Sequence, residues 1–369
     1  MRETRLLIVL SLLSACAPNR GTAYDRAYFE ATRAESAGRL AEAAAAYDRA
    51  AAGAKRPRDR EIARWAAADA LARVGHVGEA VARLDAMAAD GTSDHQAEAA
   101  YRVCVLRIEH GDADRGWRDM EAIPRRFSTH GVGHVAVRRL VAHADAQGPD
   151  AAAAELAALG RDLEKTELVE LVTFLAAEHV EARGDGTAAR DAYLRIAERW
   201  PYPYGAFFDD ALWHASALDE KLGRAQAAAD DLERLVAERE TTTILGSYER
   251  ARYVPSMLRL GELYAGPLHD RARARATYHR LYTDYAHSTK RDAALWHEAA
   301  LWREDGDPKT ACDRLATLVH DFPDSRYVPC ATATCQGLAR PSASGAPASC
   351  HEYIAREGGG AEPRSPTAQ

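Results

Sequence analysis

Four of the six cysteines in this chain lie close together near its C-terminal end and could form disulfide bonds. They are Cys312, Cys330, Cys335 and Cys350. In an exported chain such a cluster would be typical of two disulfides, and its spacing matches no standard Cys/His zinc pattern. Cys330 and Cys335 are five residues apart on an expected helix and point in different directions. We therefore expect the pairs Cys312–Cys330 and Cys335–Cys350, with zinc, and His351 as an added ligand, as the less favoured alternative.

The other reactive residues form no catalytic pattern. Cys104 takes a position at which related segments of the chain carry alanine or serine, so we expect a buried, inert thiol. The sequence has no His-Glu-x-x-His, Gly-x-Ser-x-Gly or Gly-x-x-x-x-Gly-Lys-Ser/Thr pattern. His297 and Glu298 are one of several charged pairs expected on solvated helix faces. We expect no enzyme activity, no cofactor and no metal.

A series of glycines divides most of the chain into units of similar length. Their spacing is 36 to 43 residues, and they are Gly38, Gly75, Gly111, Gly148, Gly184, Gly223, Gly266 and Gly306. A fixed period of roughly 20–50 residues indicates a repeat protein, in which each unit buries its apolar face against its neighbours.

The residues around each glycine predict a pair of helices. In the first unit a small residue, Ala31, precedes the glycine by seven positions, and Ala43, Tyr47 and Ala50 follow it at the fifth, ninth and twelfth. This spacing places one apolar stripe on the second helix, and the glycine suits a left-handed helix end. The sequence therefore predicts an all-α fold of eight helix–turn–helix hairpins.

At these positions the chain resembles the tetratricopeptide repeat family. Leu260-Gly261-x-x-Tyr264 is a hallmark of that family, and two units end in Trp200-Pro201 and Phe322-Pro323. The resemblance covers about residues 24–325. It implies a right-handed superhelix, or α-solenoid, in which the first helix of each hairpin lines a concave groove.

Two phrases in the last units are similar to the repeats of bacterial envelope lipoproteins. They are Tyr282-Thr-Asp-Tyr-Ala-His-Ser288 and Val319-His-Asp-Phe-Pro-Asp-Ser325. The lipoproteins concerned include the outer-membrane assembly factor BamD and the Tol-Pal-associated coordinator of cell division. The resemblance implies an envelope protein that binds other proteins.

A ladder of large side chains lies at position five of the first helices, counted in the family's register. Its members are Tyr28, Trp65, Tyr101, Arg138, Phe174, Trp213, Leu258 and Trp296. In the family this position commonly faces the groove, where aromatic rings supply a large contact area for an extended peptide or a helix. The same rings could instead pack between neighbouring repeats, and both interpretations stay open. Polar companions follow one or two helical turns later, at Thr32, Asp69, Glu178, Glu262 and Arg303.

The N-terminus predicts export and lipid attachment. Arg2 and Arg5 precede the apolar run Leu6–Leu13, which is far shorter than the ~20 residues that span a membrane. Leu13-Ser14-Ala15-Cys16 resembles the lipobox of bacterial lipoproteins, in which the cysteine carries the lipid; an ordinary secretory signal is the alternative. By the same analogy, Ala17 favours the outer membrane.

Composition excludes nucleic acid as the expected partner. The formal charge is −7, and it becomes −8 once residues 1–15, with two arginines and one glutamate, are removed. Nucleic-acid binding needs basic surface, and the run Lys55-Arg56-Pro57-Arg58 is followed by Asp59 and Glu61, as in a solvated loop.

These observations predict five segments: a signal peptide at 1–15, the lipidated Cys16 with a linker at 16–23, a solenoid at 24–325, a cysteine-bearing cap at 326–357 and a disordered tail at 358–369. We expect a non-catalytic scaffold at the periplasmic face of a Gram-negative outer membrane, bound to periplasmic or outer-membrane protein segments. A pilotin-like or Tol-Pal-linked division factor is an alternative within that class. An accessory helical domain of a peptidoglycan-cleaving enzyme is the alternative from another class.

Overall fold

The computed structural model describes residues 20–238, 250–342 and 344–357, and every regular element in these residues is a helix. The leader 1–15, Cys16 and the tail 358–369 lie outside the described residues. The chain divides into two compact units, residues 1–172 and 173–369, and the boundary falls within α10 (Val169–Ala182).

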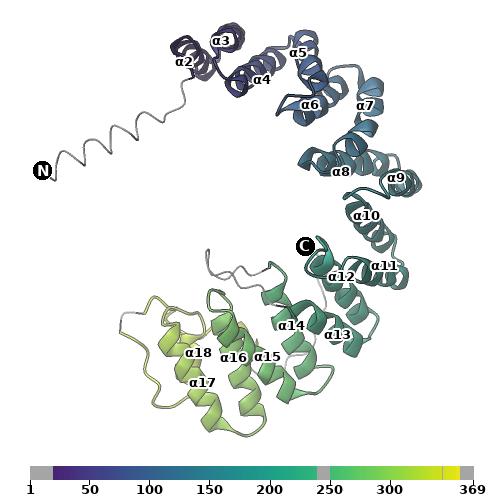
Figure 1. The fold of residues 1–369 in the computed structure, drawn as a ribbon. Coiled ribbons are helices and arrows are strands. Elements are labelled where there is room, and N and C mark those ends of the chain that lie inside the picture. The colour runs from purple at the N-terminus through teal and green to yellow at the C-terminus, as the bar shows by residue number, and fades with distance from the viewer. Residues whose placement is uncertain (1–19, 239–249, 343, 358–369) are drawn as a thin grey trace, which may run out of the picture. The chain divides into compact units, whose positions relative to one another are not determined.

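Unit 1 contains four helical hairpins before α10. Its helices are α2 (Thr22–Ser36), α3 (Leu40–Gly53), α4 (Pro57–Val74), α5 (Val77–Ala89), α6 (Gln96–Glu109), α7 (Ala113–Arg126), α8 (Gly131–Asp145) and α9 (Pro149–Asp162). Each helix packs against the next along the chain, so that neighbouring hairpins lie side by side (Figure 1).

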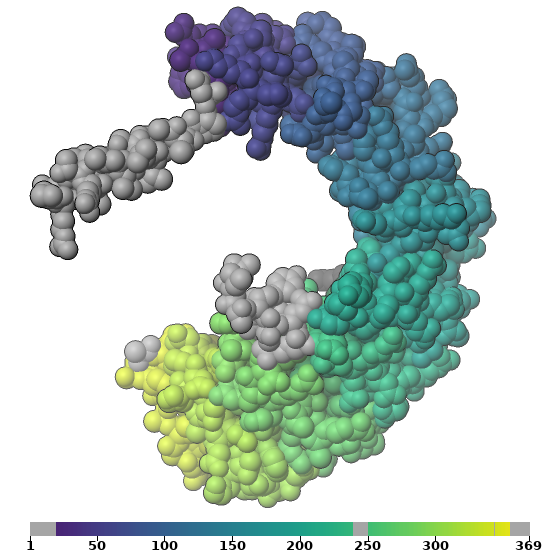
Figure 2. Space-filling view, viewed as in Figure 1, coloured from purple at the N-terminus to yellow at the C-terminus, as the bar shows by residue number. Residues whose placement is uncertain are grey.

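Unit 2 continues the same arrangement and ends in a cap. After α10 it contains α11 (Gly186–Arg199), α12 (Phe208–Lys221), α13 (Ala225–Val236), α14 (Tyr253–Ala265), α15 (Arg271–Asp284), α16 (Arg291–Glu304), α17 (Pro308–Asp321), α18 (Val328–Thr334) and α19 (Glu352–Glu357). Figure 2 shows the residues of α14–α18, in green to yellow, as one continuous packed body. The predicted all-helical repeat class, with eight hairpins from α2 to α17, is confirmed in the described residues.

The turn within each hairpin uses the glycine that sets the repeat. Gly75 ends α4 at φ 93°, a left-handed conformation that glycine adopts without the steric cost of a Cβ. Its N–H donates to the carbonyl of Ala72 at 3.1 Å, and the N–H of His76 donates to Leu71 at 2.9 Å. This pair of hydrogen bonds satisfies the last carbonyls of the helix. Gly266 is the exception among the eight, at φ −92°, and His269 takes the positive φ in that turn.

Close backbone approach explains the small residues within the hairpins. Gly261 on α14 lies against the ring of Tyr278 on α15, and a Cβ at that glycine would come within 2.5 Å of the ring. Ala43, Ala228 and Ala311, which follow the turn glycines by five residues, have no exposed surface. These contacts bury the apolar stripe that the sequence places on each second helix.

Arginine side chains also join successive hairpins by hydrogen bonds to backbone carbonyls. The repeat pattern in the sequence did not predict these contacts. Arg234 on α13 donates to the last turn of α11, at the carbonyl of Ala197, over 3.1 Å. Arg280 on α15 does the same to Val236 of α13 at 2.9 Å, and in unit 1 Arg126 of α7 reaches Ala88 of α5 at 2.7 Å. Helix ends leave carbonyls without partners, so each guanidinium satisfies one of them from the following repeat.

The disulfide pairing expected from the sequence is wrong. Cys312 bonds to Cys335, with Cα atoms 5.7 Å apart, and Cys330 bonds to Cys350, at 4.6 Å. The expectation placed Cys330 and Cys335 on one helix. Instead α18 ends at Thr334, and Cys335 has extended backbone, so it turns back to α17 while Cys330 meets the returning chain.

We expect each disulfide to stabilise the cap locally. A Cys330→Ala, Cys350→Ala double variant should lose ~2–5 kcal/mol of cap stability. Because repeat stability is a sum of local and neighbour terms, hydrogen exchange should rise in α17–α19 and stay unchanged in unit 1. Cys104→Ala is the control, since among the described cysteines it is the one that forms no disulfide. Peptide mapping without reduction that joined Cys312 to Cys330 would contradict this assignment.

Candidate functional site

The ladder residues fall on the first helix of each hairpin, as predicted, but their surroundings differ. Phe174 on α10 and Trp296 on α16 are 5% and 3% exposed. The ring of Phe174 stacks on Phe207, with centroids 4.6 Å apart, and the ring of Trp296 stacks on Tyr327 of the cap at 5.5 Å. These two rings therefore pack in the core and do not face a groove, which corrects the groove expectation for both.

Tyr28, at the start of the ladder, is half-buried within its own hairpin. Its ring stacks on Tyr24 at 5.3 Å and meets the ring of Tyr47 edge-on at the same distance. Part of this ring is open to solvent, and its contacts with other rings lie within α2 and α3.

The next two rings of unit 1 touch the hairpin that follows. The half-buried Trp65 on α4 lies 5.9 Å from the ring of His95, which immediately precedes α6. The hydroxyl of Tyr101 on α6 accepts a long hydrogen bond, 3.5 Å, from Arg139 on α8. Arg138, the ladder member of α8, is exposed. Trp65 and Tyr101 thus contact the following repeat while each stays partly exposed.

Trp213 on α12 is the ring best placed to meet a partner. It is half-buried, and two guanidinium groups flank it, those of Arg252 at 5.4 Å and Arg259 at 5.5 Å from the ring centroid. Contacts of this length between a cation and an aromatic face are attractive. Each guanidinium is also paired with a carboxylate of α12: Arg252 with Asp210 at 2.7 Å, and Arg259 with Glu220.

We call Trp213, Asp210, Glu220, Arg252 and Arg259 the Trp213 surface. Its four charged side chains keep between about a quarter and two fifths of their area exposed, so they are available for hydrogen bonding. A ring with two cations and two anions around it suits a polypeptide that offers an apolar side chain and mixed polar groups. Leu258, the ladder member of α14, is half-buried.

The predicted polar companions do not form a common site. Asp69 is held by arginines, at 3.4 Å from Arg102 and 3.8 Å from Arg73. Glu178 is half-buried on α10, Glu262 is exposed on α14, and Arg303 is exposed on α16.

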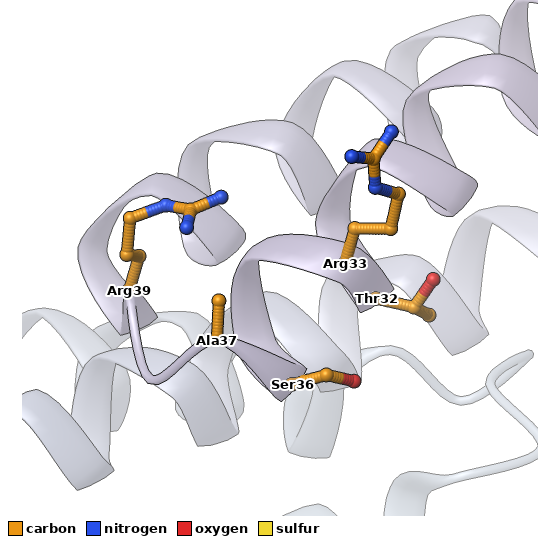
Figure 3. A pocket seen from close by; sticks show the side chains of 5 residues that line it. All are labelled: Thr32, Arg33, Ser36, Ala37 and Arg39. Carbon is orange, nitrogen blue, oxygen red and sulfur yellow. The ribbon is translucent and has the colours of Figure 1, made fainter.

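Thr32 lines a hollow of about 420 Å³ at the turn from α2 to α3, together with Arg33, Ser36, Ala37 and Arg39 (Figure 3). Arg39 is paired with Glu42 at 2.8 Å, and Thr32 donates to the carbonyl of Phe29 at 3.0 Å. None of the five residues that line this hollow has a carboxylate, thiol or imidazole that could act as a general base.

Chemistry elsewhere is equally limited in the part of the chain that the structure describes. Cys104 is buried, donates to the carbonyl of Ala100, and has its pKa raised to about 11 by burial, so it stays a thiol. No group of three His, Cys, Asp or Glu side chains among these residues could hold a metal ion. None of the described helices is both long and apolar enough to cross a bilayer.

Two buried carboxylates between α11, α12 and α13 were not anticipated. Asp219 has no exposed surface, and its oxygens lie 3.0 Å from the Nε of Arg190 and 3.6 Å from Arg224. Asp231 is 8% exposed. Burial, and then the nearby charge of Asp219, raises the pKa of Asp231 to about 6. Both aspartates occupy positions that the helical pattern assigns to a solvent-facing side, so nothing in the sequence indicated that they are buried.

Comparison with known proteins identifies the last two hairpins. The family model described as "Tetratricopeptide repeat" matches residues 256–288 and 293–325, which hold α14–α15 and α16–α17. These two stretches are tetratricopeptide repeats, and repeats of this kind serve as protein-interaction scaffolds. No curated protein sequence matches the chain.

Several solved structures are similar to this chain at low identity. A tetratricopeptide repeat protein from Parabacteroides merdae is 14% identical over 73% of this chain and 95% of its own, with a TM-score of 0.32. Pseudomonas aeruginosa pilF is 12% identical over 63% and 94%, with a TM-score of 0.36. The quorum sensor NprR from B. thuringiensis is 9% identical over 86% and 92%, with a TM-score of 0.37. At such scores these likenesses carry no argument about function.

The two tryptophans should respond differently to truncation. Trp296→Ala leaves a cavity in the core and should cost ~3–5 kcal/mol of stability. Trp213→Ala should cost only ~1–2 kcal/mol, because the ring packs against the core on one side only and stays partly exposed beside two arginines. Urea unfolding followed by circular dichroism measures both. An equal loss in the two variants would place Trp213 in the core as well.

Asp231 should make unit 2 less stable as the pH rises. Its folded-state pKa, about 6, lies above the ~3.9 of an unfolded aspartate, so its contribution is present below pH ~4 and is lost as the pH rises through 6. The difference corresponds to at most ~3 kcal/mol. Asp231→Asn should therefore be more stable than the parent at pH 7.5 and no more stable at pH 3, below both pKa values. The neighbouring, exposed Asp230→Asn is the control; the same gain in both variants would contradict a special role for Asp231.

Proposed function

We propose that this chain is a non-catalytic adaptor lipoprotein of the bacterial envelope. In this proposal Cys16 anchors it to the periplasmic face of the outer membrane, and its helical repeats bind a segment of a periplasmic or outer-membrane protein. The partner takes part in assembling or maintaining the envelope.

The Trp213 surface carries the binding part of the proposal. It joins α12 to the start of α14, and Arg259 lies within the first stretch that matches the tetratricopeptide repeat. A partly exposed tryptophan beside two ion pairs resembles the centre of a protein interface, where aromatic and arginine side chains supply most of the binding energy. The charged pairs around the ring can exchange partners with polar groups of a bound segment, while the ring contacts an apolar side chain.

The cap and the leader support the envelope location. Two disulfides within 40 residues suit a chain that folds in an oxidising compartment, such as the periplasm, because the cytosol keeps thiols reduced. The sequence of residues 1–16 resembles an export signal with a lipobox, as described above. Disulfide-bonded structure and an export signal are independent features of the chain, and both point to the same compartment.

One experiment in intact cells tests the anchor and the binding surface together. A photo-crosslinking amino acid replaces Ala217, one helical turn after Trp213 and partly exposed, in the full-length chain. After illumination the cells are separated into membrane and soluble fractions. We expect a discrete crosslinked adduct in the membrane fraction. With Trp213→Ala the adduct should weaken at least ~30-fold in apparent affinity, which corresponds to a hot-spot loss of ~2 kcal/mol or more.

Two controls separate the parts of the proposal. The same crosslinker at the exposed Asp230 of α13 should give no adduct of that mass. Cys16→Ser should move the protein from the membrane fraction to a soluble or unprocessed form. Membrane fractionation that does not change in Cys16→Ser would reject the anchor, and an adduct that survives Trp213→Ala would reject the binding surface.

A further inference from the structure

The basic run that reads as a solvated loop in the sequence lies beside the first described residue of the chain. The backbone N–H of Lys55, in the turn between α3 and α4, donates to the carbonyl of Arg20 at 3.3 Å. Gly21 sits so close to the end of α3 that a Cβ there would lie 3.1 Å from the carbonyl of Gly53. The start of α2 and the turn before α4 therefore form one local surface (Figure 1).

This surface is strongly basic in a chain whose net charge is −7. Residues 20–26 and 54–60 contain six basic and two acidic side chains, a local formal charge of +4. One of the acids, Asp59, is 2% exposed and is neutralised by Arg56 at 3.3 Å and Arg20 at 4.0 Å. It therefore offers little negative charge to an approaching ligand.

The exposed cations of this surface are available to a ligand. Arg20, Lys55 and Arg58 are all exposed, and the side chain of Arg20 keeps 56% of its area open. Neither Lys55 nor Arg58 has a carboxylate oxygen of any described residue within 4.0 Å of its side-chain nitrogens. We call Arg20, Lys55 and Arg58 the N-terminal basic surface.

The position of the N-terminal basic surface in the sequence, close to Cys16, indicates which kind of ligand it contacts. Arg20 is the fourth residue after Cys16, a reach of at most ~14 Å. A lipid on Cys16 would therefore hold these cations within one or two Debye lengths of the headgroups, since that length is ~8 Å at physiological salt. Nucleic-acid binding would need basic surface over a long track, whereas the chain as a whole carries a net charge of −7.

We propose that the N-terminal basic surface contacts anionic phospholipid headgroups and holds the first hairpin against the membrane. The proposal rests on the proposed anchor at Cys16 for its placement. The contact is electrostatic: each lysine or arginine near an anionic bilayer raises binding about five-fold. It adds a second attachment to the lipid and limits how freely the first hairpin swings about its tether.

The test uses the processed chain, residues 16–369 with Cys16→Ser, which retains every described residue and carries no lipid. Its partition into vesicles of equal parts phosphatidylglycerol and phosphatidylethanolamine is measured by co-sedimentation at low ionic strength. Vesicles of phosphatidylcholine alone are the neutral reference. We expect the parent to bind the anionic vesicles, and the Lys55→Gln, Arg58→Gln double variant to bind about 25-fold less, from two charges at about five-fold each.

A matched variant and a soluble anion complete the design. The Arg138→Gln, Lys165→Gln double variant removes two other exposed cations of unit 1, far along the chain, and should leave binding within about two-fold of the parent. Equal binding to neutral and anionic vesicles, or equal losses in the two double variants, would overturn the proposal. So would displacement by inorganic phosphate that exceeds displacement by chloride at the same ionic strength, because it would indicate a phosphate site. Since this chain has no acylated cysteine, these outcomes do not depend on whether Cys16 is lipidated in cells.

Discussion

Close backbone approach between successive helices is the constraint on which the rest of this structure depends. A single hairpin has too little apolar surface to stay folded, and it gains stability by burying that surface against its neighbours. Alanine or glycine at the contact positions lets the helices come near enough to do so, as where Gly261 meets the ring of Tyr278. Once the helices are in contact, each ladder side chain is either covered by the following repeat or left partly exposed to solvent. Arginines such as Arg234 then join second helix to second helix by satisfying the free carbonyls at helix ends.

This constraint also explains why side chains at the same position of different repeats can be buried in one hairpin and partly exposed in another. Trp296 and Trp213 occupy the same position in their hairpins, yet Tyr327 of the cap covers the first, whereas the second is flanked by Arg252 and Arg259. The difference lies in what the next element carries at the point of contact. An apolar ring excludes water and completes a core, while long charged side chains pack along the ring face and keep their ends in solvent. The Trp213 surface is therefore a product of packing and is held in shape by ion pairs.

Hairpins at the ends of a repeat array have a neighbour on one side only, and this chain treats its two ends differently. After α17 the open face is covered by α18 and the returning chain, which two disulfides fasten. At α2 no hairpin precedes the first one within the described residues, and the exposed groups there include Arg20 and Lys55. A covalently closed end suits an oxidising compartment, and a cationic end suits an anionic surface.

The sequence alone determined the number of hairpins, their turn glycines and the burial of Cys104, because these follow from the 3.6-residue period of helices and from which residues tolerate a left-handed turn. It also placed the ladder on the first helices. Only the tertiary structure decided which ladder residues are covered, because a helical period defines a face but not the element that packs on it. The disulfide pairing depended on where α18 ends: one residue of extended backbone at Cys335 redirects that thiol to α17. The buried pair Asp219 and Asp231 likewise has ordinary polar positions in the sequence, and its environment exists only once three helices have come together.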